Sequence, residues 1–387
     1  MNFRSINKFN VVVNALSGNF LPLSEEKTSA NFACTIYVIF TWVLKFIFLS
    51  SMSIGLLCYV PAFEALQRGA VTTIVAVETL SLSAYWNFHR ENLQNLIGKM
   101  NKILVDSEDL KRCIHETIGP HKKRLKIYTI ATVITVFFWA LLPVMKISES
   151  SQFTYVDFVL PSYLPGAPFS TNFFIFWIII EAFGGTYLIF KKIGMDVYVN
   201  YVITLLTAQY RYVHEIIYNA LRRDDCGEDE GKSLVIDSLR KCVRYQCEVM
   251  EIGQMVRKLL AVNVALTYLS CVLRFCFLAF FIITIPGNYF EKCFYLSYTI
   301  GILIQVYMFC SCCQGLLDAS TSITDDAFHE DWYGRGKTVK RIFQTIGLSN
   351  RMECRLSAFR VVDLTVPTFV AILNQAYSAC LLLLRVQ

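Results

Sequence analysis

The stretch TVPTFVAILNQAYSACLLLLRVQ, residues 365–387, is long and apolar enough to cross a membrane as a single helix. Two amides, Asn374 and Gln375, and the phenol of Tyr377 stand in its middle. Buried polar groups are costly in lipid, where no water satisfies them. The stretch therefore indicates a membrane helix whose polar face is turned toward protein or toward a water-filled path.

The whole chain has the composition of a polytopic membrane protein. Of its 387 residues, 55% are hydrophobic and 17% are charged, and the mean hydropathy is +0.46. Soluble proteins carry about 25% charged residues. Segments of about 20 apolar residues match a hydrocarbon core of about 30 Å, and they predict seven spans. These spans cover residues 33–59, 69–88, 126–147, 172–190, 259–285, 294–317 and 361–385.

The distribution of positive charge sets the orientation of these spans. The segments on one side hold 30 of the 36 Lys and Arg residues, and the segments on the other side hold four. Because cytoplasmic loops are enriched in Lys and Arg, we expect a cytoplasmic N-terminus and an extracellular C-terminus. The predicted fold class is an all-α membrane protein with seven transmembrane helices in this orientation. A seven-span G-protein-coupled receptor has the opposite orientation.

The cytosolic segments also show helical patterns. After Phe190, apolar residues continue at helical spacing to about residue 221, so the fourth helix is expected to project into the cytosol. Residues 232–258 resume an amphipathic pattern before the fifth span. GRGKTVKRIFQTIGLSN, residues 334–350, is a short basic amphipathic helix that either lies on the membrane surface or packs with the projecting helices. The second alternative predicts a cytosolic helical assembly region.

No set of residues suits catalysis or metal binding. The five histidines all fall in cytosolic segments, and no pair has a spacing typical of metal ligands. Cys310, Cys312 and Cys313 stand in an apolar span without histidine and are interpreted as small packing residues. There is no glycine-rich phosphate loop and no arrangement typical of a catalytic triad. We therefore expect no enzyme activity, catalytic residue, metal, cofactor or nucleic-acid partner.

The last seventy residues carry a specific series of short motifs. They are Asp331-Trp332-Tyr333, Leu356-Ser357-Ala358-Phe359, Thr368-Phe369 and Ala376-Tyr377-Ser378, which follow Cys310 in this order. The series resembles the C-terminal signature of insect odorant receptors, whose length, topology and orientation this chain also matches. The related gustatory receptors end their last helix with Thr-Tyr and then Gln-Phe, a pattern from which this chain departs. The co-receptor of the odorant family has a much longer segment than 191–258, so the chain looks like a ligand-tuning subunit.

This resemblance implies a heterotetrameric, ligand-gated, non-selective cation channel assembled with the odorant co-receptor. It would detect small volatile molecules in the plasma membrane of olfactory sensory neurons. The implied parts are a cytoplasmic N-terminal segment (1–32), six transmembrane helices with an outer-half ligand pocket and cytosolic extensions (33–317), a cytosolic anchor segment (318–360) and a pore-lining seventh helix (361–387). The alternatives are a gustatory-type receptor channel and a seven-span G-protein-coupled receptor.

Residues of the last helix are the candidates for the pore. Apolar side chains recur at spacings of three and four and share one face: Val366, Val370, Leu373, Tyr377, Cys380 and Leu384. Such a stripe is either ordinary buried packing or, around a symmetry axis, a hydrophobic gate. In the family pattern, the positions that match Cys380 and Leu384 lie at the outer gate. The predicted pore residues are Leu373, Asn374, Tyr377, Cys380, Leu381 and Leu384.

The ligand pocket is expected to be small, apolar and lined by aromatic rings. By resemblance it lies in the outer half, between the second, third, fourth and sixth spans, with a contribution from the fifth. The predicted lining is Thr72, Val75, Ala76, Phe138, Trp139, Leu142, Trp177, Ile178, Phe280, Tyr295, Tyr298 and Thr299. Each of these side chains has packing as its alternative role. Their aromatic content favours a ring-containing volatile.

Glu78, Glu181 and Arg274 are charged residues at membrane depth in the predicted spans, and Lys45 stands near the middle of the first span. Charges at membrane depth are paired or functional. One hypothesis pairs Arg274 with Glu181 or Glu78 as a structural tie behind the pocket. The other leaves a glutamate unpaired, so that it can recognise the ammonium group of an amine odorant.

Overall fold

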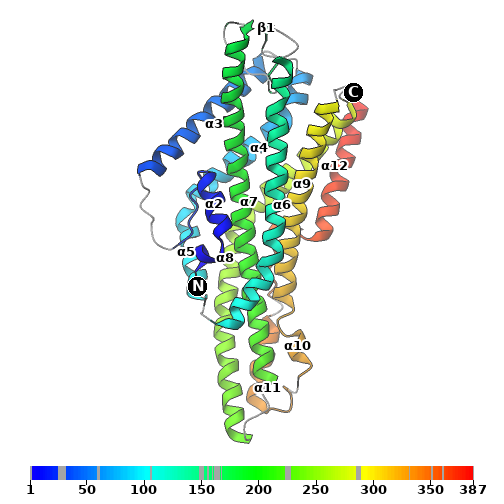
Figure 1. The fold of residues 1–387 in the computed structure, drawn as a ribbon. Helices are drawn as coiled ribbons and strands as arrows, with labels where there is room; N and C mark the ends of the chain where they lie inside the picture. Colours follow the sequence, from blue (N-terminus) through cyan, green and yellow to red (C-terminus); the bar gives the residue numbers. More distant parts are fainter. Residues whose placement is uncertain are drawn as a thin grey trace.

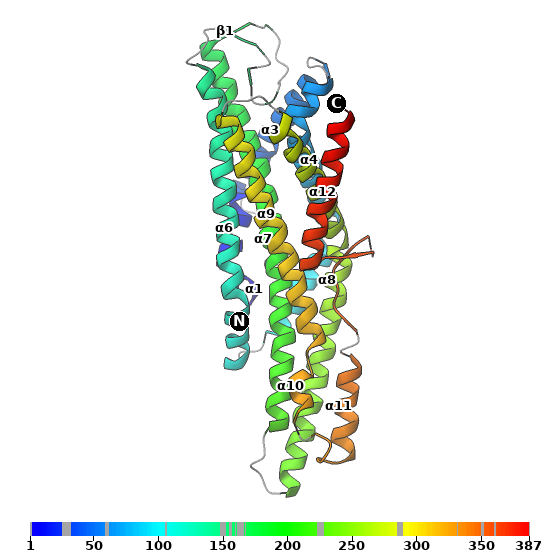
Figure 2. The same cartoon turned by 90° about the vertical axis from the view of Figure 1, so that its right-hand side faces the viewer.

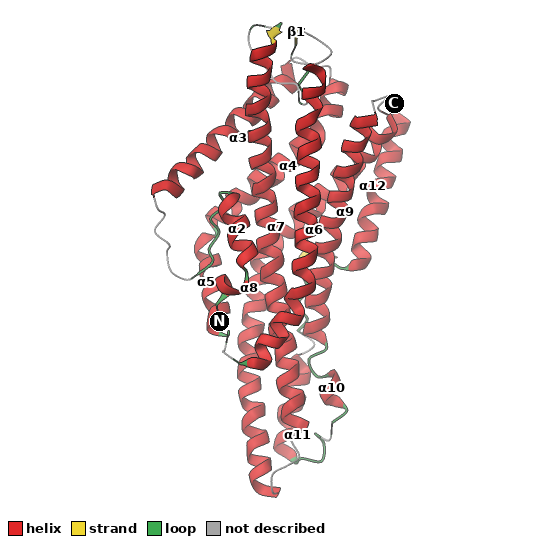
Figure 3. Cartoon of the chain, viewed as in Figure 1, coloured by secondary structure: helices red, strands yellow, loops and turns green. Residues whose placement is uncertain are grey.

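The computed structural model describes residues 2–24, 32–58, 62–104, 107–147, 152–154, 157–158, 160, 166, 168–222, 228–284, 289–330, 332–349, 352–359 and 361–386. Helices make up nearly all of this part of the chain (Figure 3). They are α1 (Phe3–Ile6), α2 (Lys8–Leu16), α3 (Phe32–Cys58), α4 (Ala62–Phe88), α5 (Arg90–Lys102), α6 (Glu108–Ile147), α7 (Thr171–Arg222), α8 (Glu228–Thr284), α9 (Tyr289–Thr321), α10 (Asp325–Phe328), α11 (Lys337–Ser349) and α12 (Val366–Val386). Two antiparallel strand pairs join them: β1 (Gln152–Phe153) with β2 (Phe169–Ser170), and β3 (Ser357–Ala358) with β4 (Val362–Asp363).

The long helices form an elongated bundle (Figure 1). α6, α7, α8 and α9 run side by side, α12 lies on the flank formed by α8 and α9, and α3 crosses obliquely (Figure 2). The C-terminus and β1 lie at one end, and α10, α11, the last turns of α7 and the first turns of α8 lie at the other (Figure 1). The charge distribution makes the first end the outer one.

Six described helices are long and apolar enough to cross a membrane: α3, α6, α7, α8, α9 and α12. The helix over the second predicted span, α4, is absent from this set because Glu78 and several Ser and Thr residues lower its hydropathy. The seven-helix, all-α prediction is confirmed. The third span differs from its prediction, since α6 begins at Glu108 rather than at residue 126.

Two helices reach far beyond the membrane, as the apolar pattern after Phe190 predicts. α7 has 52 residues and α8 has 57. At about 1.5 Å per residue these helices are roughly 80 Å long, whereas the hydrocarbon core is about 30 Å thick. Their inner parts therefore form a cytosolic stalk.

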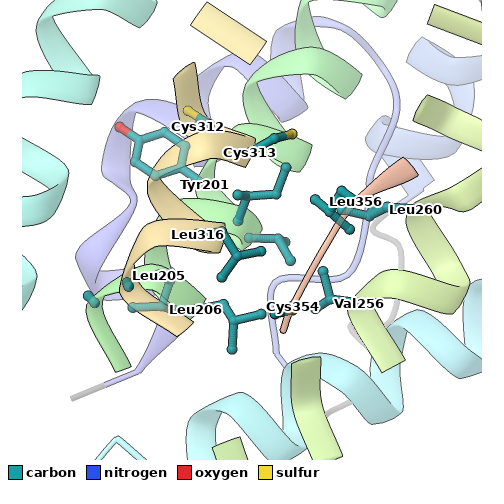
Figure 4. Close-up of a cluster of buried hydrophobic side chains, with 14 of the residues drawn as sticks. Tyr201, Leu205, Leu206, Val256, Leu260, Cys312, Cys313, Leu316, Cys354 and Leu356 are labelled. Atoms are coloured by element: carbon teal, nitrogen blue, oxygen red, sulfur yellow. The ribbon is translucent and has the colours of Figure 1, made fainter. Parts of the chain in front are cut away.

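The stalk and the inner half of the bundle share one large core. Every residue of α7 from Lys191 to Tyr210 is buried, because α2, α6, α8 and α9 surround this part of the helix. Figure 4 shows the place where α7, α8, α9 and the segment 352–359 meet: Tyr201, Leu205, Leu206, Val256, Leu260, Cys312, Cys313, Leu316, Cys354 and Leu356. Burial raises the pKa of the Cys354 thiol to about 11. The interior of this region is apolar.

The N-terminal segment contributes two short helices that the sequence pattern did not predict. The ring of Phe3 makes an edge contact with Tyr198 of α7, with centroids 5.9 Å apart. The Tyr198 hydroxyl donates a hydrogen bond to the carbonyl of Pro22 at 2.8 Å. These contacts hold residues 2–24 against the buried part of α7.

The segment before the last helix belongs to the stalk. Val339, Phe343 and Ile346 of α11 are buried, and this helix packs on α8 at the inner end of the molecule. Of the two alternatives for residues 334–350, packing with the projecting helices is the one observed. The indole of Trp332 stacks on Phe343 with centroids 4.8 Å apart.

A tight hairpin leads into α12. Phe359 has a φ of 53° between β3 and β4, and the Thr368 hydroxyl donates a hydrogen bond to the carbonyl of Asp363 at 2.5 Å. The helix begins at Val366, not at residue 361, because the β4 strand occupies the positions just before it. Pro367 stands in its first turn, where the missing amide proton costs nothing.

Candidate functional site

A cavity of about 40 Å³ lies inside the bundle, where five helices meet. Its wall is formed by α4, α6, α7, α8 and α9, and it comprises Val75, Tyr128, Thr132, Thr135, Ile189, Lys192, Ile193, Arg274, Tyr298, Gly301, Ile302 and Gln305. This volume accommodates a few water molecules or the polar group of a small ligand. Apolar side chains share this wall with the polar groups of Lys192, Arg274, Gln305 and several Tyr and Thr residues.

Lys192 and Arg274 of this wall belong to a balanced cluster of four charged residues. The ammonium of Lys192 lies 2.8 Å from Glu78 Oε1 and 2.6 Å from Asp196 Oδ1, and Arg274 Nη2 lies 3.5 Å from Glu78 Oε2. All four side chains are at least nine-tenths buried. Two acids and two bases compensate one another, as charges at membrane depth require.

Neutral side chains complete this cluster and extend it to further helices. The hydroxyl of Ser270 donates to Glu78 at 2.6 Å, and the Tyr128 hydroxyl donates to Asp196 at 2.9 Å. The amide of Gln305 donates to Asp196 at 2.6 Å, while its oxygen lies 3.4 Å from Arg274 Nη1. The network thereby ties α4, α6, α7, α8 and α9 to one another.

The basic residues of the cluster border the cavity, and the acidic ones do not. Lys192 and Arg274 belong to its wall, whereas Glu78 and Asp196 do not. The carboxylates are engaged by the bases and by hydroxyl and amide donors behind the wall. The cavity therefore presents hydrogen-bond donors and positive charge.

Of the two partners expected for Arg274, Glu78 is the one in contact. Glu181 is buried in α7 and lies 11 residues before Lys192, or about 16 Å along the helix. Glu78 is paired in this conformation, and recognition of an amine by one of the two glutamates stays a prediction.

The twelve predicted lining residues do not converge on this one cavity. Val75 and Tyr298 belong to its wall. Ala76 and Trp139 pack in a small cluster with Phe48 and Leu188, and Ile178 and Trp177 pack in another. Phe280 and Tyr295 belong to a third cluster, against α12. The half-buried Thr72, Phe138, Leu142 and Thr299 lie on α4, α6 and α9, and the Thr299 hydroxyl bonds to the carbonyl of Tyr295 within its own helix.

Five polar residues of the network escaped the sequence prediction. Lys192 and Asp196 fall just beyond the apolar span 172–190 and are therefore assigned to the cytosol, while Tyr128, Ser270 and Gln305 look like ordinary polar residues within spans. A signal existed for the first pair, since an i, i+4 spacing of Lys and Asp places opposite charges on one helix face. Only the structure shows that this face is turned inward.

The last helix, α12, has one packed face and one open face. Thr368, Ile372, Ala376 and Cys380 are buried against the bundle, whereas the exposed residues are Val366, Pro367, Val370, Asn374, Gln375, Tyr377, Ser378, Leu381, Leu382 and Arg385. Asn374, Tyr377 and Leu381 thus lie on the open face, as the pore prediction requires. A hydrogen bond of 2.7 Å from the Tyr268 hydroxyl of α8 to Gln375 Oε1 bridges the edge of this face.

Three of the predicted pore residues are placed differently. Cys380 is 2% exposed and packs against Cys276, Phe280 and Phe281, and Leu384 is half-buried beside the same cluster. Leu373 is half-buried against the large core. In this conformation α12 turns Cys380 toward α8, and its role at the outer gate stays a prediction. Within the described residues, no group of His, Cys, Asp and Glu is placed to hold a metal ion.

A profile of the 7tm Odorant receptor family matches residues 59–377, which is most of the chain. The chain belongs to the odorant receptor family. It is accordingly a multi-pass membrane receptor and not an enzyme, and the match favours this interpretation over the gustatory-type and G-protein-coupled alternatives. Residues of the C-terminal motifs pack in the stalk. The Trp332 ring stacks on Phe343 of α11, and Leu356 and Ala358 are buried.

Relatives and solved structures agree with this assignment. The receptor is 27% identical to Odorant receptor 67a of Drosophila melanogaster over 143 residues, which are 37% of this chain and 35% of that relative's length. It is 21% identical to Odorant receptor 67c of the same organism over 322 residues, which cover 81% of this chain and 73% of the relative. The fold matches the insect olfactory receptor OR5 from Machilis hrabei in complex with eugenol, with a TM-score of 0.83, 16% identity and coverage of 100% and 99% of the two chains. The OR5 structure without a named ligand gives a TM-score of 0.81 at 15% identity, with coverage of 99% and 98%.

Proposed function

We propose that this receptor is the ligand-tuning subunit of an odorant-gated, non-selective cation channel in the plasma membrane of olfactory sensory neurons. The subunit assembles as a heterotetramer with the odorant co-receptor. The observation that carries the proposal is the open face of α12, on which Asn374, Tyr377 and Ser378 stand among apolar side chains. Amides and hydroxyls turned to lipid are costly, so this face needs water or protein opposite it.

The open face of α12 lines the pore. Four copies of such a helix around an axis form a constriction in which rings of Tyr377 and Leu381 alternate with polar rings. Apolar rings close a pore by excluding water, and a small outward movement of the helices lets polar groups hydrate it. Leu373, Cys380 and Leu384 lie on or near the packed side and serve to hold α12 on α8 and α9 in the conformation described here.

The ligand is a small, ring-containing volatile with a hydrogen-bond-accepting oxygen. Its oxygen accepts from Arg274 or Lys192 in the polar wall, and its ring packs among the small outer clusters that contain Trp139 and Tyr295. The volume of the cavity matches the oxygen-bearing group of the ligand and not its ring. The side chains of the outer clusters must therefore shift when the ring of the ligand enters. Eugenol, the ligand of the OR5 complex, combines an aromatic ring with such oxygens.

The assignment to a tuning subunit rests on the short junction between α7 and α8. Only residues 223–227 separate the two helices, so no inserted segment lengthens the stalk. The stalk, with α11 and the 352–359 segment packed on it, is the part that holds subunits together. Seven positive charges in residues 318–360 keep this mass on the cytoplasmic side.

The proposed function is tested by recording current from cells that express the receptor with an insect odorant co-receptor. A broad panel of neutral volatiles should evoke cation currents with a reversal potential near zero, and neither subunit alone should give the same ligand selectivity. Blocking G-protein signalling should leave the currents unchanged. Absence of ligand-evoked current from receptor that is present at the cell surface would overturn the proposal.

The orientation of α12 is tested separately by cysteine accessibility. A charged thiol reagent applied from outside should reduce the current through Leu381→Cys channels, because this position faces the pore. The wild-type receptor is the matched control, since its own Cys380 is buried one position away. Equal sensitivity of the wild type would place Cys380 in the pore instead.

A further inference from the structure

Two lysines are buried next to the same aromatic ring, where α3 packs against α7. Lys45 is 1% exposed and Lys191 is 3% exposed. Lys45 Nζ lies 4.8 Å and Lys191 Nζ lies 4.0 Å from the centroid of the Trp42 ring. Lys45 Nζ has no hydrogen-bond partner. Two basic groups therefore share one neutral neighbour.

Neither lysine forms an ion pair with a carboxylate of the described residues. The buried carboxylates of Glu78 and Asp196 are both engaged by the adjacent Lys192, at 2.8 and 2.6 Å. The polar contact given to Lys191 is made by its backbone, whose carbonyl accepts a hydrogen bond from the Asn19 amide at 2.9 Å. The pair thus lacks the compensation that the balanced cluster has.

At least one of these two amines is uncharged in the folded receptor. Burying an ammonium group without a partner is unfavourable, and a second ammonium group beside it adds repulsion. A cation–π contact with one shared ring offsets only part of this penalty. Unlike arginine, lysine can give up its proton when it is buried. The pair therefore contains a free amine, which is a nucleophile.

This amine lies at the depth of the hydrocarbon core. Lys45 stands in the middle of α3, a helix that crosses the membrane and that is mostly open to lipid. Trp42 is 37% exposed, and Phe40, Val43 and Phe46 on the same helix are at least half exposed. Ions are excluded from this depth, whereas small apolar molecules dissolve in it. A reactant for the amine is therefore lipophilic, and it reaches the pair from the lipid past Trp42.

We propose that the pair of Lys45 and Lys191 captures lipophilic aldehydes from the membrane as reversible imines. The uncharged amine attacks the aldehyde carbon, so a C–N bond forms and a carbinolamine results. The carbinolamine then loses its hydroxyl group together with the remaining proton on nitrogen as one water molecule, which leaves a C=N bond. Addition of water reverses the reaction, and no oxidant or reductant is needed.

The chemistry of the pair is that of lysines that react with carbonyl compounds. Such a lysine is activated by burial in an apolar site or by a neighbouring basic group, and both conditions hold here. The pair is separate from the cavity bordered by Lys192 and Arg274. The proposed capture of aldehydes is therefore independent of the odorant-gated channel function.

The test uses the purified full-length receptor in phosphatidylcholine nanodiscs, treated with a limiting amount of hexanal and with sodium cyanoborohydride. The reductant converts each imine to a stable N-hexyl lysine, which peptide mapping by mass spectrometry locates and quantifies. Lys45 and Lys191 together should carry at least about ten times more adduct than the exposed Lys126 of α6, because exposed lysines are protonated at neutral pH. Glyoxylate, whose carboxylate keeps it out of the lipid, should reverse this order.

Two variants show whether the pair itself carries the reactivity. Lys191→Arg places a permanent charge beside Lys45, so all adduct of the pair should move to Lys45. Lys45→Met/Lys191→Met should lose the adducts of the pair and keep that of Lys126. Its unfolding temperature should equal or exceed that of the wild type, because two uncompensated buried groups are gone.

Several outcomes would overturn the proposal. They are equal labelling of Lys126 and the pair by hexanal, labelling of the pair by glyoxylate as readily as by hexanal, and loss of the Lys45 adduct in Lys191→Arg. A lower unfolding temperature of the double methionine variant would overturn the inference that the pair is uncompensated. None of these measurements requires a ligand-evoked current, so a failure of the proposed channel function is distinguishable from a failure of this site.

Discussion

The two halves of α7 pack in different ways. From Lys191 to Tyr210 every residue is buried, whereas Phe176, Ile179 and Phe183 in the outer half are about half exposed. The inner half belongs to one continuous core, and the outer half is bordered by small separate clusters. A continuous core has one arrangement, while small clusters can repack independently. The inner half is thus suited to assembly and the outer half to ligand entry.

The charged network stands at the boundary between these halves. Its members come from five helices, and one of them, Arg274, borders the cavity on the same helix that carries Tyr268. A ligand that competes for Arg274 changes a contact on α8, and α8 holds α12 through Tyr268. This arrangement links the adaptable half to the proposed gate.

The largest expected effect comes from breaking the network. Glu78→Gln removes the carboxylate partner of Arg274 and one partner of Lys192. Loss of one member of a buried ion pair costs about 3–5 kcal/mol, so the detergent-solubilised receptor should unfold several degrees earlier. Glu91→Gln, an exposed change on α5, should leave the unfolding temperature unchanged.

A second substitution tests whether the four charged residues act as one cluster. Adding Lys192→Met to Glu78→Gln restores the balance of two charges, Asp196 and Arg274, and should recover part of the lost stability. If the double variant is as unstable as the sum of both single variants, the four charges do not act as one cluster.

The contrast between the two halves predicts unequal costs for similar truncations. Leu206→Ala in the continuous core should reduce the free energy of unfolding by about 3–5 kcal/mol, because the surrounding helices cannot close the cavity. Ile178→Ala in an outer cluster should cost only about 2 kcal/mol, since that cluster can collapse. Chemical denaturation or thermal unfolding of the two variants measures the difference. Equal losses would remove the distinction between a rigid and an adaptable half.

Much of this architecture follows from the sequence. Hydropathy predicts the seven apolar spans, the distribution of Lys and Arg predicts their orientation, and the helical period predicts the projection of the fourth helix. Each of these signals depends on residues that are close in the sequence. The helices α1 and α2 are not visible in this way. Their short patterns gain stability only from packing on α7, through contacts such as that between Phe3 and Tyr198.

The site was less predictable than the fold. Periodicity places Cys380 and Tyr377 on one stripe, but the boundary between packed and open faces depends on how α12 is rotated on α8. Similarly, Lys192 looks cytosolic in a linear count of spans, whereas a surrounding layer of helices buries it. The packed face of α12 and the burial of Lys192 both depend on how a helix is rotated and on what surrounds it. Hydropathy and periodicity along the sequence do not contain this information.

The polar wall of the cavity predicts a preference among ligands of one carbon skeleton. Acetophenone and 1-phenylethanol carry an accepting oxygen, ethylbenzene lacks one, and 1-phenylethylamine carries a cation that Lys192 and Arg274 repel. The half-maximal concentration for acetophenone and for 1-phenylethanol should be at least about tenfold lower than that for ethylbenzene or 1-phenylethylamine. This ratio corresponds to about 1.4 kcal/mol of binding free energy. Concentration–response curves from the co-expressed channel measure it. A lower value for the amine would instead support recognition by a carboxylate.

The smallest expected effect concerns the link between α8 and α12. Tyr268→Phe removes the hydroxyl that donates to Gln375, and an exposed hydrogen bond of this kind contributes about 1 kcal/mol. The change should shift the half-maximal ligand concentration by about fivefold without changing unfolding, because water can satisfy Gln375. Tyr307→Phe is the matched control, since its ring contact with Phe369 of α12 does not need the hydroxyl. If both variants behave like the wild type, the hydrogen bond does not couple the ligand-binding half to the gate helix, and the movement of α12 must then depend on its apolar contacts with α8 alone.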